Sequence, residues 1–105
     1  MTRKTVDWVK TGLNLKLLRQ DNITLRKNSC RGRKFKAGEC EGKCDVCRFD
    51  MDHSISRAEL ARDFGVSENV IYSWECGRTP VGVEDLLFYC DLTGVSIFDI
   101  LVFKS

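Results

Sequence analysis

Long apolar runs are missing from the 105-residue sequence, and proline and histidine each occur once, as Pro80 and His53. No stretch approaches the roughly 20 apolar residues that a membrane-spanning helix needs. The basic N-terminus, residues 1–10, is not followed by the apolar segment of a signal peptide. We therefore expect a cytoplasmic protein, in a compartment where thiols stay reduced.

Internal repeats, low-complexity tracts and a nucleophile paired with a base are also missing. No open metal site of the catalytic kind is evident either, so we expect a protein that is not an enzyme. With 43% apolar and 30% charged residues, the composition is that of an ordinary globular protein. Its length predicts a single domain over residues 1–105.

Acidic residues are scarce in the first third of the chain. Residues 1–36 hold 11 Lys/Arg and two acids, a charge of +9, whereas residues 37–105 carry −7, which leaves a net charge of +2. This division predicts a basic face and an acidic face, and a basic face suits a polyanion such as DNA. An unevenly charged but merely solvated surface is the alternative interpretation.

Apolar residues recur at helical spacing, and no stretch alternates as a half-buried strand does. Gly12 argues against a first helix that runs unbroken from residue 6. We therefore expect an all-α protein with five short helices, over residues 11–20, 57–64, 68–75, 83–92 and a last turn from 97 toward 103.

Local capping signals support these boundaries. Ser56 with Glu59, and Ser96 with Asp99, have the spacing of capping boxes. A glycine follows three of the expected helices, as in C-caps with left-handed backbone: Gly65, Gly77 and Gly94. The connection over residues 65–67 is short and contains glycine, which is typical of the turn of a helix-turn-helix.

Several spaced features resemble the lambda-repressor-like, Cro-type (Xre) helix-turn-helix family over residues 12–20 and 55–102. They are Leu15-x-x-Leu18-Arg19, Glu59-Leu60-Ala61, Gly65-Val66-Ser67, Ile71, Trp74-Glu75-x-Gly77-Arg78-x-Pro80, Asp85-Leu86-Leu87 and Gly94-Val95-Ser96-x-x-Asp99-Ile100-Leu101. The resemblance implies a five-helix DNA-binding domain, whose helix over residues 68–75 enters the major groove of double-stranded DNA. It also implies an ion pair between Arg19 and Glu75.

By position, the resemblance assigns DNA contacts to one set of residues. Base edges fall to Glu68, Asn69 and Ser73, with Tyr72 at the margin of the same face, because Asn can bind adenine and Glu can accept from cytosine. The remaining contacts, partly to phosphate, fall to Arg57, Arg78 and Thr79. Two alternatives stay open: Glu68 can simply favour the helix dipole, and Tyr72 can be a packing residue.

Residues 21–54, between the first two expected helices, are rich in cysteine and poor in aliphatic residues. Cys30, Cys40, Cys44 and Cys47 follow the spacing C-x9-C-x3-C-x2-C. Four clustered thiolates are what a closed, structural zinc site requires, and zinc binding can fold a segment that lacks a core. We therefore expect an inserted loop that binds one zinc ion.

Other uses of these cysteines stay open. Two disulfides are disfavoured in a reducing compartment. The spacing of the last three cysteines also matches an iron–sulfur motif, which would make the loop a redox sensor. His53 is expected to be an exposed residue rather than a ligand, while Cys76 and Cys90 lie apart from the cluster.

Basic residues precede the second cysteine of the loop, among them Arg31, Arg33 and Lys34. A basic loop beside the helix-turn-helix could contact the DNA backbone or minor groove, bind a protein, or respond to metal loss. We expect a small transcriptional regulator, a repressor, that binds DNA as a homodimer. Its dimer contact is expected at the C-terminal aromatic residues, Phe88, Phe98 and Phe103. The rival hypothesis is an antitoxin or adaptor that binds a protein partner.

Overall fold

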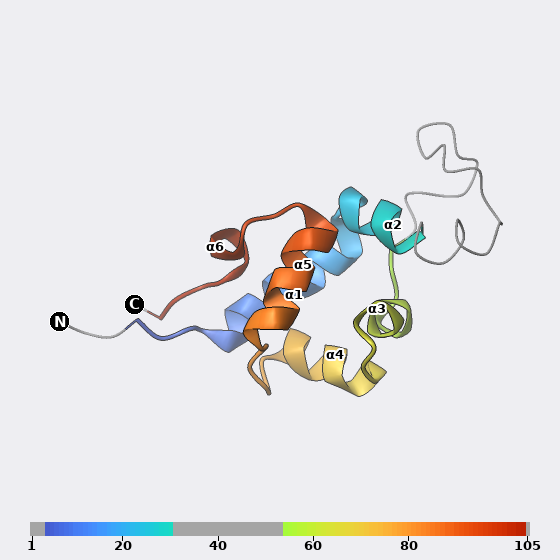
Figure 1. Ribbon diagram of the computed structural model, residues 1–105. Coiled ribbons are helices and arrows are strands. Elements are labelled where there is room, and N and C mark those ends of the chain that lie inside the picture. Colours follow the sequence, from blue (N-terminus) through green and yellow to red (C-terminus); the bar gives the residue numbers. More distant parts are fainter. Residues whose placement is uncertain (1–3, 31–53, 105) are drawn as a thin grey trace.

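The computed structural model describes residues 4–30 and 54–104, with nothing described of the Cys30 side chain, and within them the chain is helical (Figure 1). The pairing of Val6 with Phe103 is the only β-bridge among these residues, and no strand is formed there. No helix in the described part is long and apolar enough to cross a membrane. The helices are α1 Trp8–Asp21, α2 Ile23–Cys30, α3 Arg57–Phe64, α4 Glu68–Cys76, α5 Val83–Thr93 and α6 Ile97–Ile100.

The all-α expectation is confirmed, but the helix α2 was not expected, so the described chain has six helices rather than five. The chain leaves α1 at Asn22, whose side chain accepts a hydrogen bond from Leu25 N at 2.8 Å and so starts the next helix. Leu25 then lies fully buried in the core. The part of the expected loop over residues 23–30 is therefore helical.

Side-chain amides fix α2 against the C-terminal end of α5. Asn22 Nδ2 donates to Thr93 O at 3.3 Å, and Asn28 Nδ2 donates to Leu92 O at 2.9 Å. Both carbonyls lie in the last turn of α5, where helix carbonyls lack partners within the helix. These contacts join residues 71 and 64 positions apart in sequence, so no local pattern could predict them.

The start of α1 also differs from expectation. Asp7 caps it by accepting from Lys10 N at 3.1 Å, and the helix continues unbroken through Gly12. Gly12 is buried because the backbone of α1 comes very close to α4 at this point. The glycine that weakened the sequence-based prediction is therefore what lets the two helices approach each other.

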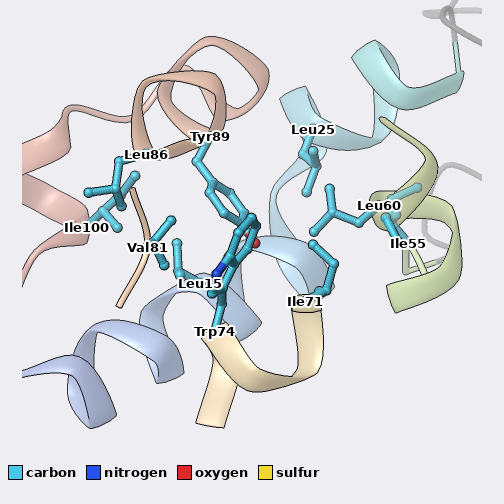
Figure 2. Close-up of a cluster of buried hydrophobic side chains, with 11 residues drawn as sticks. Leu15, Leu25, Ile55, Leu60, Ile71, Trp74, Val81, Leu86, Tyr89 and Ile100 are labelled. Atoms are coloured by element: carbon cyan, nitrogen blue, oxygen red, sulfur yellow. The ribbon is translucent and has the colours of Figure 1, made fainter. Parts of the chain in front are cut away.

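The core lies between α1, α4 and α5 and extends to α2 and α3. In Figure 2, Trp74 and Tyr89 lie at its centre, with Leu86 and Ile100 on one side and Leu60 on the other. The ring of Phe64 contacts this centre, at centroid distances of 5.5 Å from Trp74 and 4.6 Å from Tyr89. The cluster comprises Leu15, Leu25, Ile55, Leu60, Ala61, Ile71, Trp74, Val81, Leu86, Tyr89 and Ile100.

The two ends of the described chain lie side by side (Figure 1). The last helix, α6, ends at Ile100. Phe103, which was expected to lie in the last helical turn, is therefore not helical. Extended segments then pair, with Asp7 N donating to Val102 O at 2.7 Å and Lys104 N donating to Thr5 O at 2.8 Å. Ser96 Oγ accepts from Phe98 N at 3.2 Å, and the reciprocal bond of a capping box is not formed at α6.

Candidate nucleic-acid interface

Helices α3 and α4 form the expected helix-turn-helix. The capping box of α3 is present: Ser56 Oγ accepts from Glu59 N at 3.1 Å, and Glu59 Oε1 accepts from Ser56 N at 3.4 Å. Gly65 ends α3 with a left-handed φ of 69°, which a residue with a Cβ rarely adopts. The chain can therefore reverse within three residues and begin α4 at Glu68.

The two faces of α4 differ as a recognition helix requires. Ile71 and Trp74 are buried in the core. Glu68 and Asn69 are exposed on the opposite side, and Tyr72 is 38% exposed. Of the residues predicted to contact base edges, only Ser73 is half-buried. The outer face of α4 thus carries most of the predicted contact residues in accessible positions.

Two arginines lie against the ring of Tyr72. The guanidinium carbon of Arg57, from the start of α3, is 5.2 Å from the ring centroid, and that of Arg78, from the loop after α4, is 5.5 Å away. Guanidinium groups at this distance are attracted to an aromatic ring. Residues 57, 72 and 78, separate in sequence, therefore form one basic cluster, which we call the arginine–tyrosine cluster.

Behind this cluster lies a buried ionic network. Arg19 Nε and Nη2 donate to the two carboxylate oxygens of Glu75, at 2.7 and 3.1 Å, which confirms the expected pair. Arg19 Nη1 also donates to Ile55 O at 2.8 Å. The Glu75 side chain is only 1% exposed, so Glu75 holds α1, α3 and α4 together rather than facing a ligand.

Arg57 belongs to both arrangements. Its Nε donates to Glu75 Oε1 at 3.0 Å while its guanidinium lies against Tyr72. The family resemblance predicts a DNA contact for Arg57, and its pairing with Glu75 was not expected. Its side chain is 32% exposed, so part of the guanidinium still reaches the surface.

Comparison with protein families gives a match to a Cro/C1-type helix-turn-helix DNA-binding domain over residues 51–105. The chain belongs to this family. Comparisons with curated proteins and with solved structures found no match. The protein is thus a helix-turn-helix DNA-binding protein of the kind found in transcription regulation, and double-stranded DNA is its partner.

The range that matches the Cro/C1-type domain begins after α1 and α2. In the structure, however, α1 packs directly against α4, which lies inside that range. The N-terminal end of α4 is open: Ser67 makes no side-chain hydrogen bond to the first turn. Backbone N–H groups at such an end favour a phosphate. Thr79, in the loop beside Arg78, is exposed as a phosphate contact requires.

The other predicted site residues fall outside the described part of the domain. These are the metal ligands Cys40, Cys44 and Cys47 and the basic residues Arg31, Arg33 and Lys34. His53, which was not expected to be a ligand, lies outside the described residues as well. Cys30 is the last residue of α2. Among the residues that are described, no three His, Cys, Asp or Glu side chains are grouped as a metal site would need.

Proposed function

We propose that the protein is a sequence-specific repressor that inserts α4 into the major groove of double-stranded DNA. The observation that carries the proposal is the arginine–tyrosine cluster, which lies beside the accessible outer face of α4. Core packing and the Glu75 network fix the inner face of the helix. A rigid helix presents its outer side chains with little entropy left to lose on binding.

Within this proposal, different residues have different tasks. Asn69 and Glu68 read base edges, since Asn donates to and accepts from adenine and Glu accepts from the cytosine amino group. Arg57 and Arg78 bind phosphate, and Tyr72 keeps their guanidinium groups in place. Ser73, which is half-buried, reads bases only at close approach. Thr79 adds a neutral phosphate contact.

Arg78→Gln is expected to weaken binding to all duplexes about equally. A binding site is first selected from a pool of random duplexes, and affinity is then measured against salt concentration. Loss of one phosphate contact should reduce the slope of log K against log salt by about 0.9. Asn69→Ala should leave that slope unchanged and relax discrimination at one base pair by about 1–3 kcal/mol.

Lys104→Gln serves as the matched control, because Lys104 is an exposed cation beside the paired chain ends. It should leave both the slope and the base preference at the wild-type values. Equal slopes for Arg78→Gln, Lys104→Gln and the wild-type protein would rule out a phosphate contact at Arg78.

We further propose that Cys30, Cys40, Cys44 and Cys47 bind one zinc ion, and that Arg31, Arg33 and Lys34 contact the DNA backbone. The spacing of the four thiols and the shortage of aliphatic residues around them support this. Elemental analysis of protein purified without added metal should give one zinc per chain and no visible absorbance. Iron with visible absorbance would favour the redox-sensing alternative. A sample that contains neither zinc nor iron would contradict the proposed metal site.

We also propose that two chains bind together on a two-fold symmetric site. Dimers of helix-turn-helix proteins place two recognition helices one DNA turn apart. A site recovered by selection should then contain two inverted half-sites.

A further inference from the structure

A groove lies between the last turns of α1 and the segment that joins α5 to α6. It has a volume of about 360 Å³, which is enough for one long side chain. Its apolar lining consists of Leu17, Leu18 and Val95. Leu17 is 46% exposed, so this apolar wall is accessible from solvent rather than closed within the core. We call this site the α1–α6 groove.

Oxygen atoms dominate the polar lining of the α1–α6 groove. The amide nitrogen of Asn14 donates to Ile100 O at 3.0 Å, which leaves the amide oxygen of Asn14 without a partner among the described residues. The other polar side chains that line the groove include two carboxylates, Asp21 and Asp99. A ligand for this groove must therefore bring hydrogen-bond donors, and preferably a positive charge.

The two carboxylates have no other task in the described part of the chain. Asp21 and Asp99 are exposed, and neither forms an ion pair or a side-chain hydrogen bond with another described residue. The spacing of Asp99 from Ser96 suggested a capping box, but the reciprocal bond is not formed. Both carboxylates are therefore available to a partner.

Two helix ends add negative potential to the groove. Asp21 is the last residue of α1, where the helix dipole already gives a partial negative charge. Val95 follows the end of α5, at Thr93, by two residues. Arg26 donates to Gln20 O in the last turn of α1, but it does not line the groove. A cation in the groove would thus meet both carboxylates and two helix C-termini.

Apolar surface extends from the groove along α1. Leu13 lies one turn before Leu17, on the same face of the helix, and is 52% exposed. A small cation bound in the groove would leave Leu13 in water, whereas a protein segment could cover both leucines. These observations favour a partner that carries apolar residues followed by an arginine or lysine.

The α1–α6 groove faces away from the proposed DNA interface. Arg19 of α1 is bonded to Glu75 of α4. Leu17 and Asp21 each lie two residues from Arg19, which places them about 200° around the helix from it. A partner in the groove would therefore leave the outer face of α4 accessible.

We infer that the α1–α6 groove is the docking site for a different protein, which lays an amphipathic helix along α1 and places one basic side chain in the groove. The stem of that side chain packs on Leu17 and Val95, and its charged group binds Asp21 and Asp99. The inference goes beyond DNA binding and does not depend on which bases or phosphates α4 contacts. It allows the protein to hold DNA and a partner on opposite sides.

The test uses the full-length protein and a fluorescently labelled model helix of about 15 residues. The helix carries leucines spaced four residues apart, followed one turn later by a single arginine, with alanine and glutamine elsewhere. Fluorescence anisotropy should show binding in the micromolar range. A second peptide, with glutamine in place of the arginine, should bind about tenfold more weakly, because it brings no charge to the groove.

Variants of the protein locate the contact. Asp21→Asn and Asp99→Asn should each raise the dissociation constant about threefold, and together about tenfold. Glu84→Gln is the matched control, because it removes one exposed negative charge in the first turn of α5, outside the groove. It should leave the dissociation constant unchanged. Circular dichroism checks that each variant is folded.

Several results would overturn the inference. They are no binding of the arginine peptide, equal binding of both peptides, and an effect of Glu84→Gln as large as that of Asp99→Asn. Pentylamine that binds as tightly as the peptide would assign the groove to a small cation instead. Light scattering that shows a wild-type dimer dissociated by Asp21→Asn would assign the groove to a second copy of the chain.

Discussion

Glu75→Gln is expected to lower the free energy of unfolding by about 3–5 kcal/mol, a large part of what a small domain has. Glutamine keeps the shape of glutamate but removes the charge that two arginines share. Arg19, only 7% exposed, would then be left as a buried cation without a counter-ion. Its bond to Ile55 O, at 2.8 Å, satisfies one nitrogen but supplies no charge.

Urea unfolding followed by far-ultraviolet circular dichroism measures this loss. Glu68→Gln provides the matched control, because it makes the same chemical change at an exposed position of the same helix. Its effect should stay within about 0.5 kcal/mol. A loss of less than about 1 kcal/mol for Glu75→Gln would mean that the pair contributes no more than a surface ion pair.

A double variant separates the pair from the packing around it. Arg19→Met removes the buried cation and keeps an unbranched, apolar side chain in its place. Combined with Glu75→Gln, it should cost less than the sum of the two single changes, because no uncompensated charge remains. Strict additivity would indicate that Arg19 and Glu75 stabilise the protein independently.

The network also links stability to the DNA interface. Arg57 is bonded to Glu75 and lies against Tyr72, so one carboxylate helps to orient a proposed phosphate-binding arginine. Glu75→Gln should therefore weaken DNA binding even where the variant is fully folded. The sequence indicated the Arg19–Glu75 pair through its family resemblance, but the second arginine depends on how α3 crosses α4.

The second half of the chain was largely predictable because its signals are local. The capping pair Ser56 and Glu59 lies within one turn. The glycines that end α3, α4 and α5 all have positive φ, which few other residues adopt. The buried positions of α4 follow a helical repeat that can be read directly from the sequence.

Helix α2 was missed for the opposite reason. Its aliphatic residues are Ile23, which is 53% exposed, and Leu25, which is fully buried, and two such residues give no helical repeat. The local signal for its start is Asn22, a residue type common at helix N-caps, which accepts a hydrogen bond from Leu25 N. The contacts that hold α2 in place are amide bonds to the distant end of α5, and these follow from the fold alone.

Gly12 was also misinterpreted because its role depends on a contact with α4, which is distant in the sequence. Replacing Gly12 is expected to change the free energy of unfolding strongly. Inside a helix, replacing glycine by alanine normally stabilises by about 1 kcal/mol. At Gly12 the added Cβ would lie 2.4 Å from Trp74 O and 2.6 Å from Glu75 O. Both are backbone atoms, so neither can move aside as a flexible side chain would.

Gly12→Ala is therefore expected to destabilise the protein by about 2 kcal/mol or more, since separating two packed helices outweighs the gain in helix propensity. Ala58→Gly, at an exposed position of α3, gives the ordinary preference in this protein and should destabilise by up to about 1 kcal/mol. Alanine is thus favoured at one site and disfavoured at the other. A stabilising Gly12→Ala would mean that α1 and α4 are farther apart than this packing requires, and that α4 is held chiefly by the Glu75 network.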